Sequence, residues 1–230
     1  MTTSRGHYSE IVSIDGVDAG KILGSYGDAL PELGGGFDRH GLGSTVNVDL
    51  YAYDAAQDVA VVQVREFERY GSSRHQYTRV RKDYVLVGRT ESGGVFRHPV
   101  TAASIHAAIR RDPSAPSGVL AAQCWMFGVK PGKLAKSVRQ GDVLLSPERS
   151  GPKGEVEELG TGIVVGESHA VEAARVVRDA KGTVWALDPI VRHSKGQHAD
   201  VCGDEVDRWH TVRLAKEAPT WSFTGGRLKD

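Results

Sequence analysis

Four histidines lie close together in the second half of this 230-residue chain, at His169, His193, His198 and His210. Imidazole titrates closest to neutral pH of all side chains and is also the commonest metal ligand. Three neutral imidazoles with an open fourth position would suit zinc or another divalent metal that activates water. His169, His193 and His198 are therefore the predicted metal ligands. A further ligand could come from Glu167, Glu172, Asp200 or Cys202.

The same histidines also suit chemistry without a metal. His169 and His198 could act as general base and general acid, as in metal-free RNA cleavage. A third interpretation is that they are loop histidines that form hydrogen bonds with the backbone. The spacing of His193 and His198 lacks the cysteine half of a zinc finger and the helical His-Glu-x2-His of a metallopeptidase. The first functional hypothesis is thus a hydrolase or nuclease that uses a divalent metal or an acid–base pair.

A second region carries basic and aromatic residues in alternation. Between Arg65 and Arg97 there are eight basic and four acidic side chains, a net charge of +4, with five aromatic rings among them. Cations beside exposed rings could follow a phosphate backbone and stack on bases. The alternative is a solvated strand face whose rings point into the core. The predicted nucleic-acid contacts are Arg74, Tyr77, Arg79, Arg81 and Lys82.

This second region favours a different class of function. It predicts a non-catalytic module that binds RNA or a protein partner, or an accessory subunit of a larger bacterial or phage assembly. A glycine-rich arm over residues 1–45 would be able to order on such a partner.

Apolar periodicity predicts an α+β fold. Alternating residues indicate strands near 46–50, 58–67, 77–88 and 95–99, which form an antiparallel meander. Thr101 can cap the one main helix, and Asp112 followed by Pro113 ends it. The apolar run 119–127 is consistent with either a strand or a short helix. We place an α+β region at 46–130.

The rest of the chain, residues 131–230, has the pattern of a small β-barrel or β-sandwich. Five short strands are expected near 141–145, 161–165, 169–177, 183–187 and 211–214. If 169–177 and 183–187 are neighbours, His169 begins one strand, and His193 and His198 bracket the loop beyond the other. The three imidazoles would then meet at one end of the barrel.

The order of motifs in this half resembles that of a small uncharacterised domain of bacteria and phages. The motifs are Gly141-Asp-Val-Leu-Leu145, Gly166-Glu-Ser-His169 and the stretch His193 to His198, followed by a closing strand with aromatic and basic residues. That domain has Gly-His-x-His and His-Glu-Glu-His at the second and third positions. This chain has Ala170 and Val171 after His169, and Ser-Lys-Gly-Gln between the later histidines. The resemblance covers about 90 residues and implies no particular activity.

Composition limits the other possibilities. The chain has 29 basic and 29 acidic side chains, which argues against wholesale attraction to nucleic acid or an anionic membrane. Two cysteines, Cys124 and Cys202, are better explained as reduced thiols than as a disulfide framework. The first residues lack the apolar core typical of a signal peptide, and no uninterrupted apolar run approaches the roughly 20 residues of a membrane span, so we expect neither. We therefore expect a cytoplasmic protein with no membrane partner, whose cofactor, if any, is a divalent metal such as zinc.

Overall fold

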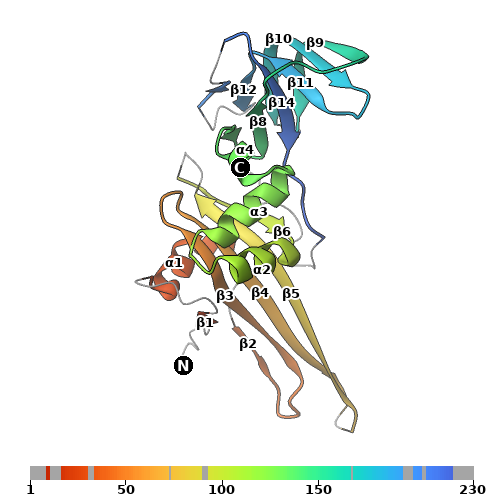
Figure 1. The fold of residues 1–230 in the computed structure, drawn as a ribbon. Coiled ribbons are helices and arrows are strands. Elements are labelled where there is room, and N and C mark those ends of the chain that lie inside the picture. Colours follow the sequence, from red (N-terminus) through yellow and green to blue (C-terminus); the bar gives the residue numbers. More distant parts are fainter. Residues whose placement is uncertain are drawn as a thin grey trace. The chain divides into compact units, whose positions relative to one another are not determined.

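The computed structural model describes residues 9–10, 17–30, 34–72, 74–89, 93–166, 168–193, 199–203 and 206–219. They form helices and two sheets, which confirms the predicted α+β class (Figure 1). The chain divides into two compact units. Unit 1 comprises Met1–Gln123 with Glu217–Asp230, and unit 2 is Cys124–Lys216.

Unit 1 is built on an antiparallel meander, as the alternation predicts. Its long strands are β3 (Gly43–Asp54), β4 (Val59–Gly71) and β5 (Gln76–Arg89), followed by the shorter β6 (Val95–Val100). Two short strands also pair with β3: β1 (Ser9–Glu10) is parallel to it and β2 (Gly34–Phe37) is antiparallel. The strands β4 and β5 are paired along their whole length, from Val59 opposite Gly88 to Gly71 opposite Gln76.

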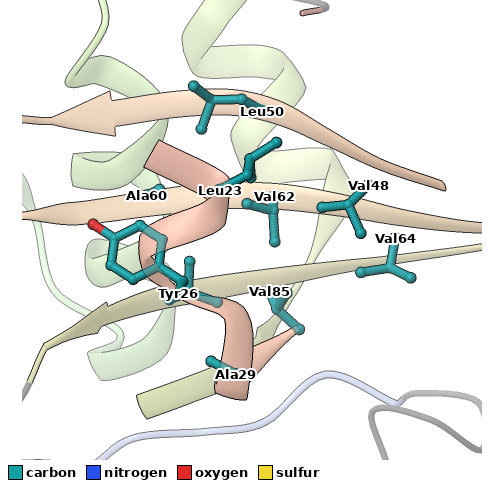
Figure 2. Close-up of a cluster of buried hydrophobic side chains, with 10 residues drawn as sticks. Leu23, Tyr26, Ala29, Val48, Leu50, Ala60, Val62, Val64 and Val85 are labelled. Carbon is teal, nitrogen blue, oxygen red and sulfur yellow. The ribbon is translucent and has the colours of Figure 1, made fainter. Parts of the chain in front are cut away.

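One face of this sheet is covered by α1 (Ala19–Ser25) and the 3-10 turn η1 (Gly27–Ala29). The side chain of Asp18 caps α1 by accepting a hydrogen bond from the Lys21 amide, at 3.1 Å. Two glycines make the helix intrinsically weak, so its stability comes mainly from packing. Figure 2 shows this packing, in which Leu23 and Tyr26 lie against valines of the sheet.

The opposite face of the sheet meets α2 (Ala102–Arg111) and α3 (Ser117–Phe127). Helix α2 begins after Thr101 and ends before Pro113, as predicted. The run whose periodicity fits either a strand or a helix forms α3. A Cβ on Gly118 would lie 2.6 Å from the Cβ of Ala52, so glycine is what allows α3 to approach the sheet this closely.

Unit 2 begins with the last residues of α3, continues with the short helix α4 (Pro131–Leu134) and consists of strands and loops thereafter. Its strands follow the order β13–β12–β10–β11–β14–β8–β7, with β9 paired to β10. The side-chain amide of Gln140 donates to the Ala199 carbonyl, so the two ends of this order lie together. A nearly closed, barrel-like sheet confirms the prediction. The strands are β7 (Val138–Gln140), β8 (Val143–Pro147), β9 (Val156–Val165), β10 (His169–Asp179), β11 (Val184–Leu187), β12 (Ile190–His193), β13 (Val201–Cys202) and β14 (Trp209–Leu214).

The five strands expected from the sequence do not include β12. This strand ends at His193 and pairs antiparallel with β10. The chain keeps its direction from β11 to β12, since both pair antiparallel with β10, Leu187 opposite Arg175 and Ile190 opposite Glu172. The two strands are interrupted only at Asp188, whose φ of 53° is left-handed, and Pro189. This two-residue interruption, which contains a proline, ends the apolar alternation of β11, so the sequence pattern does not show that pairing with β10 resumes in β12.

The helices of the described residues are short or polar in comparison with a membrane span. None of them combines the length and the apolar character needed to cross a bilayer.

Candidate functional site

Two of the predicted histidines form a cross-strand pair inside the sheet of unit 2. His169 begins β10 and lies directly opposite His193 at the end of β12. The ring centroids are 5.0 Å apart and the planes meet at 84°. The two residues are only 3% and 6% exposed. Strand pairing therefore brings together two imidazoles that are 24 positions apart and buries both.

A carboxylate lies against the first of these rings. The Nδ1 atom of His169 is 3.2 Å from Oδ1 of Asp142 and 3.2 Å from Oγ of Ser168. Asp142 sits in the two-residue turn between β7 and β8, where Gly141 adopts a φ of 53°. The Gly-Asp-Val-Leu motif thus has a structural meaning: it places a carboxylate at the histidine pair.

Gly166 makes room for this carboxylate. Its φ of 60° is left-handed, and a Cβ there would lie 3.3 Å from Asp142 and 2.9 Å from a methyl group of Leu214. The motif that ends at His169 therefore needs a glycine for both conformation and space.

This arrangement has a definite chemical capacity. A carboxylate oxygen 3.2 Å from Nδ1 favours, through its charge, a proton on that nitrogen. Nε2 of His169 is then the atom suited to accept a proton or to bind a metal. The second ring, His193, lies edge to face with the first.

The other predicted members of the histidine site are placed differently. His198 and Glu167 fall outside the described residues. Glu172 and Asp200 both pair with Arg192, at 3.0 Å. Glu172 is three positions from His169 on the same strand and therefore points to the opposite face. Cys202 is exposed. Among the described residues no group of three or more His, Cys, Asp or Glu side chains could hold a metal.

His210 belongs to the other end of the sheet. It is buried and pairs with Pro147, whereas Asp142 adjoins the opposite end of the same strand β8. Its Nδ1 lies 3.1 Å from the Arg208 carbonyl, and its ring packs against Gly203.

The second predicted region is a projecting part of the unit 1 sheet, which we call the basic hairpin and define as residues 65–82. Here β4 and β5 continue beyond the residues that pair with β6, and Figure 1 shows them extending past α2 and α3. Six cations and two carboxylates give this segment a net charge of +4. Ser73, within this range, is outside the described residues.

Three aromatic and basic side chains form a stack on one face of the basic hairpin. Tyr70 and Tyr77 are a cross-strand pair with ring centroids 5.8 Å apart and planes inclined by 28°. The guanidinium of Arg79 lies 5.5 Å from the Tyr70 ring. Tyr70 is 42% and Tyr77 59% exposed. The rings point to solvent and not into a core.

Two of the predicted nucleic-acid contacts form ion pairs with glutamates of the hairpin, and two others do not. Arg81 lies 3.2 Å from Glu66, and Arg79 lies 3.9 Å from Glu68. Tyr77, Arg79 and Arg81 share one face, while Lys82 is on the other. Arg74 and Lys82 form no ion pair with any residue in the described part of the chain.

A buried polar cluster of unit 1 escaped the sequence analysis. The side-chain amide of Gln63 donates to the hydroxyl groups of Tyr51, at 3.2 Å, and of Tyr84. The ring of His106 on α2 lies 5.6 Å from that of Tyr51 and 5.2 Å from that of Tyr84. Burial, together with the hydrogen bond to Tyr51, raises the pKa of Tyr84 to about 12. Asp49, fully buried, lies 3.4 Å from Arg65 beside this cluster.

The alternation of polar and apolar residues along the strands was the sequence feature that could have indicated this cluster. Asp49 and Gln63 each stand between apolar neighbours, as expected for a strand with one wet face. Because helices pack on both faces of this sheet, these polar residues are buried instead.

Comparison with protein-family models, with curated proteins and with solved structures found no match for the chain.

Proposed function

We propose that the protein binds single-stranded nucleic acid through the basic hairpin, with RNA as the first class to test. The observation that supports this is the stack of Arg79, Tyr70 and Tyr77, which ends in an exposed ring on a segment of net charge +4. Unpaired bases stack on such rings whatever their identity, and cations hold the backbone.

Charge complementarity favours nucleic acid over a protein partner. The two carboxylates of the hairpin, Glu66 and Glu68, are already engaged with Arg81 and Arg79. The cations at Arg74 and Lys82 have no described acidic partner and are exposed, so they are the ones available to phosphates. An acidic polymer is the ligand that compensates such a surface most directly.

The affinity of the purified chain for labelled oligouridine, measured by fluorescence anisotropy, tests the proposal. Removal of one stacking platform costs about 1–3 kcal/mol per base, so Tyr77→Ala should weaken binding about 5- to 150-fold. Tyr77→Phe keeps the ring and should bind as the wild type does. Binding that is absent even at about 50 mM salt would refute the proposal and leave a protein partner. Oligothymidine measured in parallel separates DNA from RNA.

The charge contribution is tested by a second variant. Arg74→Glu with Lys82→Glu should weaken binding and make the dependence on salt shallower, by roughly 0.7 for each phosphate that the variant no longer binds. Arg178→Glu with Lys181→Glu in unit 2 is the matched control, because it makes the same change of charge at two exposed cations outside the hairpin. An equally weakened control would show general attraction and contradict a defined site.

Hydrolysis is a second candidate, favoured by the contact between Asp142 and His169. In this hypothesis His169 acts as the general base for cleavage of a phosphodiester. His169→Gln should then lower the rate at least about 100-fold, while His210→Gln should not. An inactive wild type, or equal rates in both variants, would exclude this second function.

A further inference from the structure

The basic hairpin carries a second aromatic ring on the face opposite the tyrosine stack. Phe67 is three positions from Tyr70 on β4, and side chains alternate along a strand, so the two rings project from opposite faces. The guanidinium of Arg69 lies 5.8 Å from the centroid of the Phe67 ring. Phe67 is half-buried, and Val80, directly opposite it on β5, is 47% exposed. Each face of the hairpin thus holds an aromatic ring with an arginine beside it.

We name the two faces by these rings. The tyrosine face comprises Glu66, Glu68, Tyr70, Tyr77, Arg79 and Arg81. The phenylalanine face comprises Arg65, Phe67, Arg69, Thr78, Val80 and Lys82.

The positive charge of the hairpin is divided unequally between these faces. The two arginines of the tyrosine face are paired with its two glutamates, so this face has no net charge. The phenylalanine face carries three cations and neither glutamate, and the remaining cation, Arg74, lies in the turn. Arg65 lies 3.4 Å from Asp49, whereas Lys82 is exposed and has no acidic partner in the described part of the chain. The excess of cations therefore lies mainly on the face that lacks the tyrosines.

One strand of nucleic acid on the tyrosine face uses only part of this surface. Bases stacked on Tyr77 keep their strand on the side where the arginines are already paired, and leave Phe67 and Lys82 on the far side of the sheet. A second strand on the phenylalanine face would stack on Phe67 and neutralise the cations there. The pairing of β5 with β6 starts only at Tyr84, so none of the described strands covers the edge of residues 76–83. Nucleic acid can therefore reach both faces around this edge.

We propose that the basic hairpin holds two unpaired strands at once, one on each face, and that its preferred ligand is a junction where a duplex opens into two single strands. The sheet lies between the two strands and prevents them from pairing. Arg74, in the turn where the two faces meet, is placed for the phosphates at the end of the duplex. This inference rests on the proposed binding of nucleic acid and goes beyond it by naming the class of ligand.

Binding of a forked duplex to the full chain tests the inference. The fork has two unpaired oligouridine arms of about six nucleotides, and a reference duplex has one such arm. Once one arm is bound, the second is held at a high effective concentration, so the wild type should bind the fork at least about 10-fold more tightly than the reference. Fluorescence anisotropy at one salt concentration measures both affinities.

Two substitutions at one position separate stacking from general attraction. Phe67→Leu keeps the charge and an apolar side chain but removes the ring, so the fork should lose its advantage. Affinity for the one-armed duplex should change by less than about 3-fold, because the tyrosine face has two rings and is the stronger of the two sites. Phe67→Tyr keeps the ring and should retain the preference for the fork. Circular dichroism of each variant shows whether the fold is intact.

The outcomes distinguish this inference from the proposed function. Equal affinity of the wild type for both duplexes, with Tyr77→Ala still weakening each, would overturn the two-strand inference and leave single-strand binding in place. A fork advantage that persists in a folded Phe67→Leu variant would show general attraction to the additional phosphates and would overturn it too. Failure of the wild type to bind either duplex at low salt would refute the proposed function and this inference together.

Discussion

The basic hairpin of unit 1 can be compared with the end of the unit 2 sheet that holds His169 and His193, which we call the histidine end. Each is centred on a cross-strand pair of rings, Tyr70 with Tyr77 and His169 with His193, at 5.8 and 5.0 Å. The tyrosines are 42% and 59% exposed, whereas the histidines are 3% and 6% exposed. The same cross-strand placement of two rings therefore gives an exposed, stacked pair in one region and a buried, edge-to-face pair in the other.

Sheet architecture accounts for the difference. In unit 1, β4 and β5 run on past the residues that α1, α2 and α3 cover, so both faces of the basic hairpin meet water. In unit 2, the strand order nearly closes on itself, so every second residue is enclosed. The basic hairpin therefore presents its aromatic rings to solvent, whereas the histidine end keeps its imidazoles buried.

Stability provides the sharpest contrast. His193→Ala should lower the free energy of unfolding by about 3 kcal/mol, because it leaves a cavity beside a buried ring and carboxylate. Tyr77→Ala should change it by no more than about 0.5 kcal/mol, since the side chain is exposed. Urea denaturation of both variants checks the pair. Equal losses would mean that the two regions do not differ in this way.

Two left-handed glycines extend the contrast to the backbone. Gly166→Ala should cost about 2–3 kcal/mol, from strain at its φ of 60° and from the contact with Leu214 at 2.9 Å. Gly41→Ala, beside Arg69 at the end of the first sheet, meets its nearest atom at 3.4 Å and should cost about 1 kcal/mol. Thermal melting curves measure both. A larger loss for Gly41 would contradict the enclosed nature of the histidine end.

The pH dependence of unfolding tests the burial of Tyr84, in the part of β5 that the helices cover. Burial raises the pKa of Tyr84 from 10.0 to about 12. The folded state therefore favours the neutral phenol, so this contribution is present below pH 10 and is lost as pH rises toward 12. At pH 11 the loss should be about 1 kcal/mol relative to pH 9. The Tyr84→Phe variant should lack that loss; if it declines in parallel with the wild type, the assignment to Tyr84 is wrong.

The ion pairs of the basic hairpin should have the smallest effect. Arg81 and Glu66 are partly exposed, and such pairs contribute about 0.2–1 kcal/mol. Arg81→Gln should therefore lower stability by less than about 1 kcal/mol, and less still in high salt. Denaturation at two salt concentrations checks this. A larger loss that salt does not reduce would place Arg81 in the core of the unit.

Local patterns predicted most of the elements. The alternation at Val46, Val48 and Leu50 correctly indicated β3, and Thr101 with Pro113 bounded the main helix. Turn residues of the second half correctly indicated a barrel-like sheet. The sequence does not decide between strand and helix for α3. Its residues are apolar on all sides, so they show neither the helical nor the strand period.

Predicting the candidate sites required the spatial arrangement as well. The sequence indicated His169 and His193 by residue type, but the role of Asp142 depends on a turn that lies 27 positions earlier in the chain. Cross-strand register likewise pairs Arg79 and Arg81 with glutamates, which composition alone cannot show. Coverage of both faces of the first sheet, which buries Gln63 and Asp49, is a tertiary property that alternation does not reveal.

Photocrosslinking tests the central claim most directly. An oligonucleotide that contains 4-thiouridine is bound to the full chain and irradiated, and the modified peptides are identified by mass spectrometry. The account predicts adducts on the peptides that carry Tyr70 and Tyr77, and their disappearance in the Tyr77→Ala variant. Adducts confined to Cys124–Lys216, or an absence of adducts at saturating oligonucleotide, would contradict it.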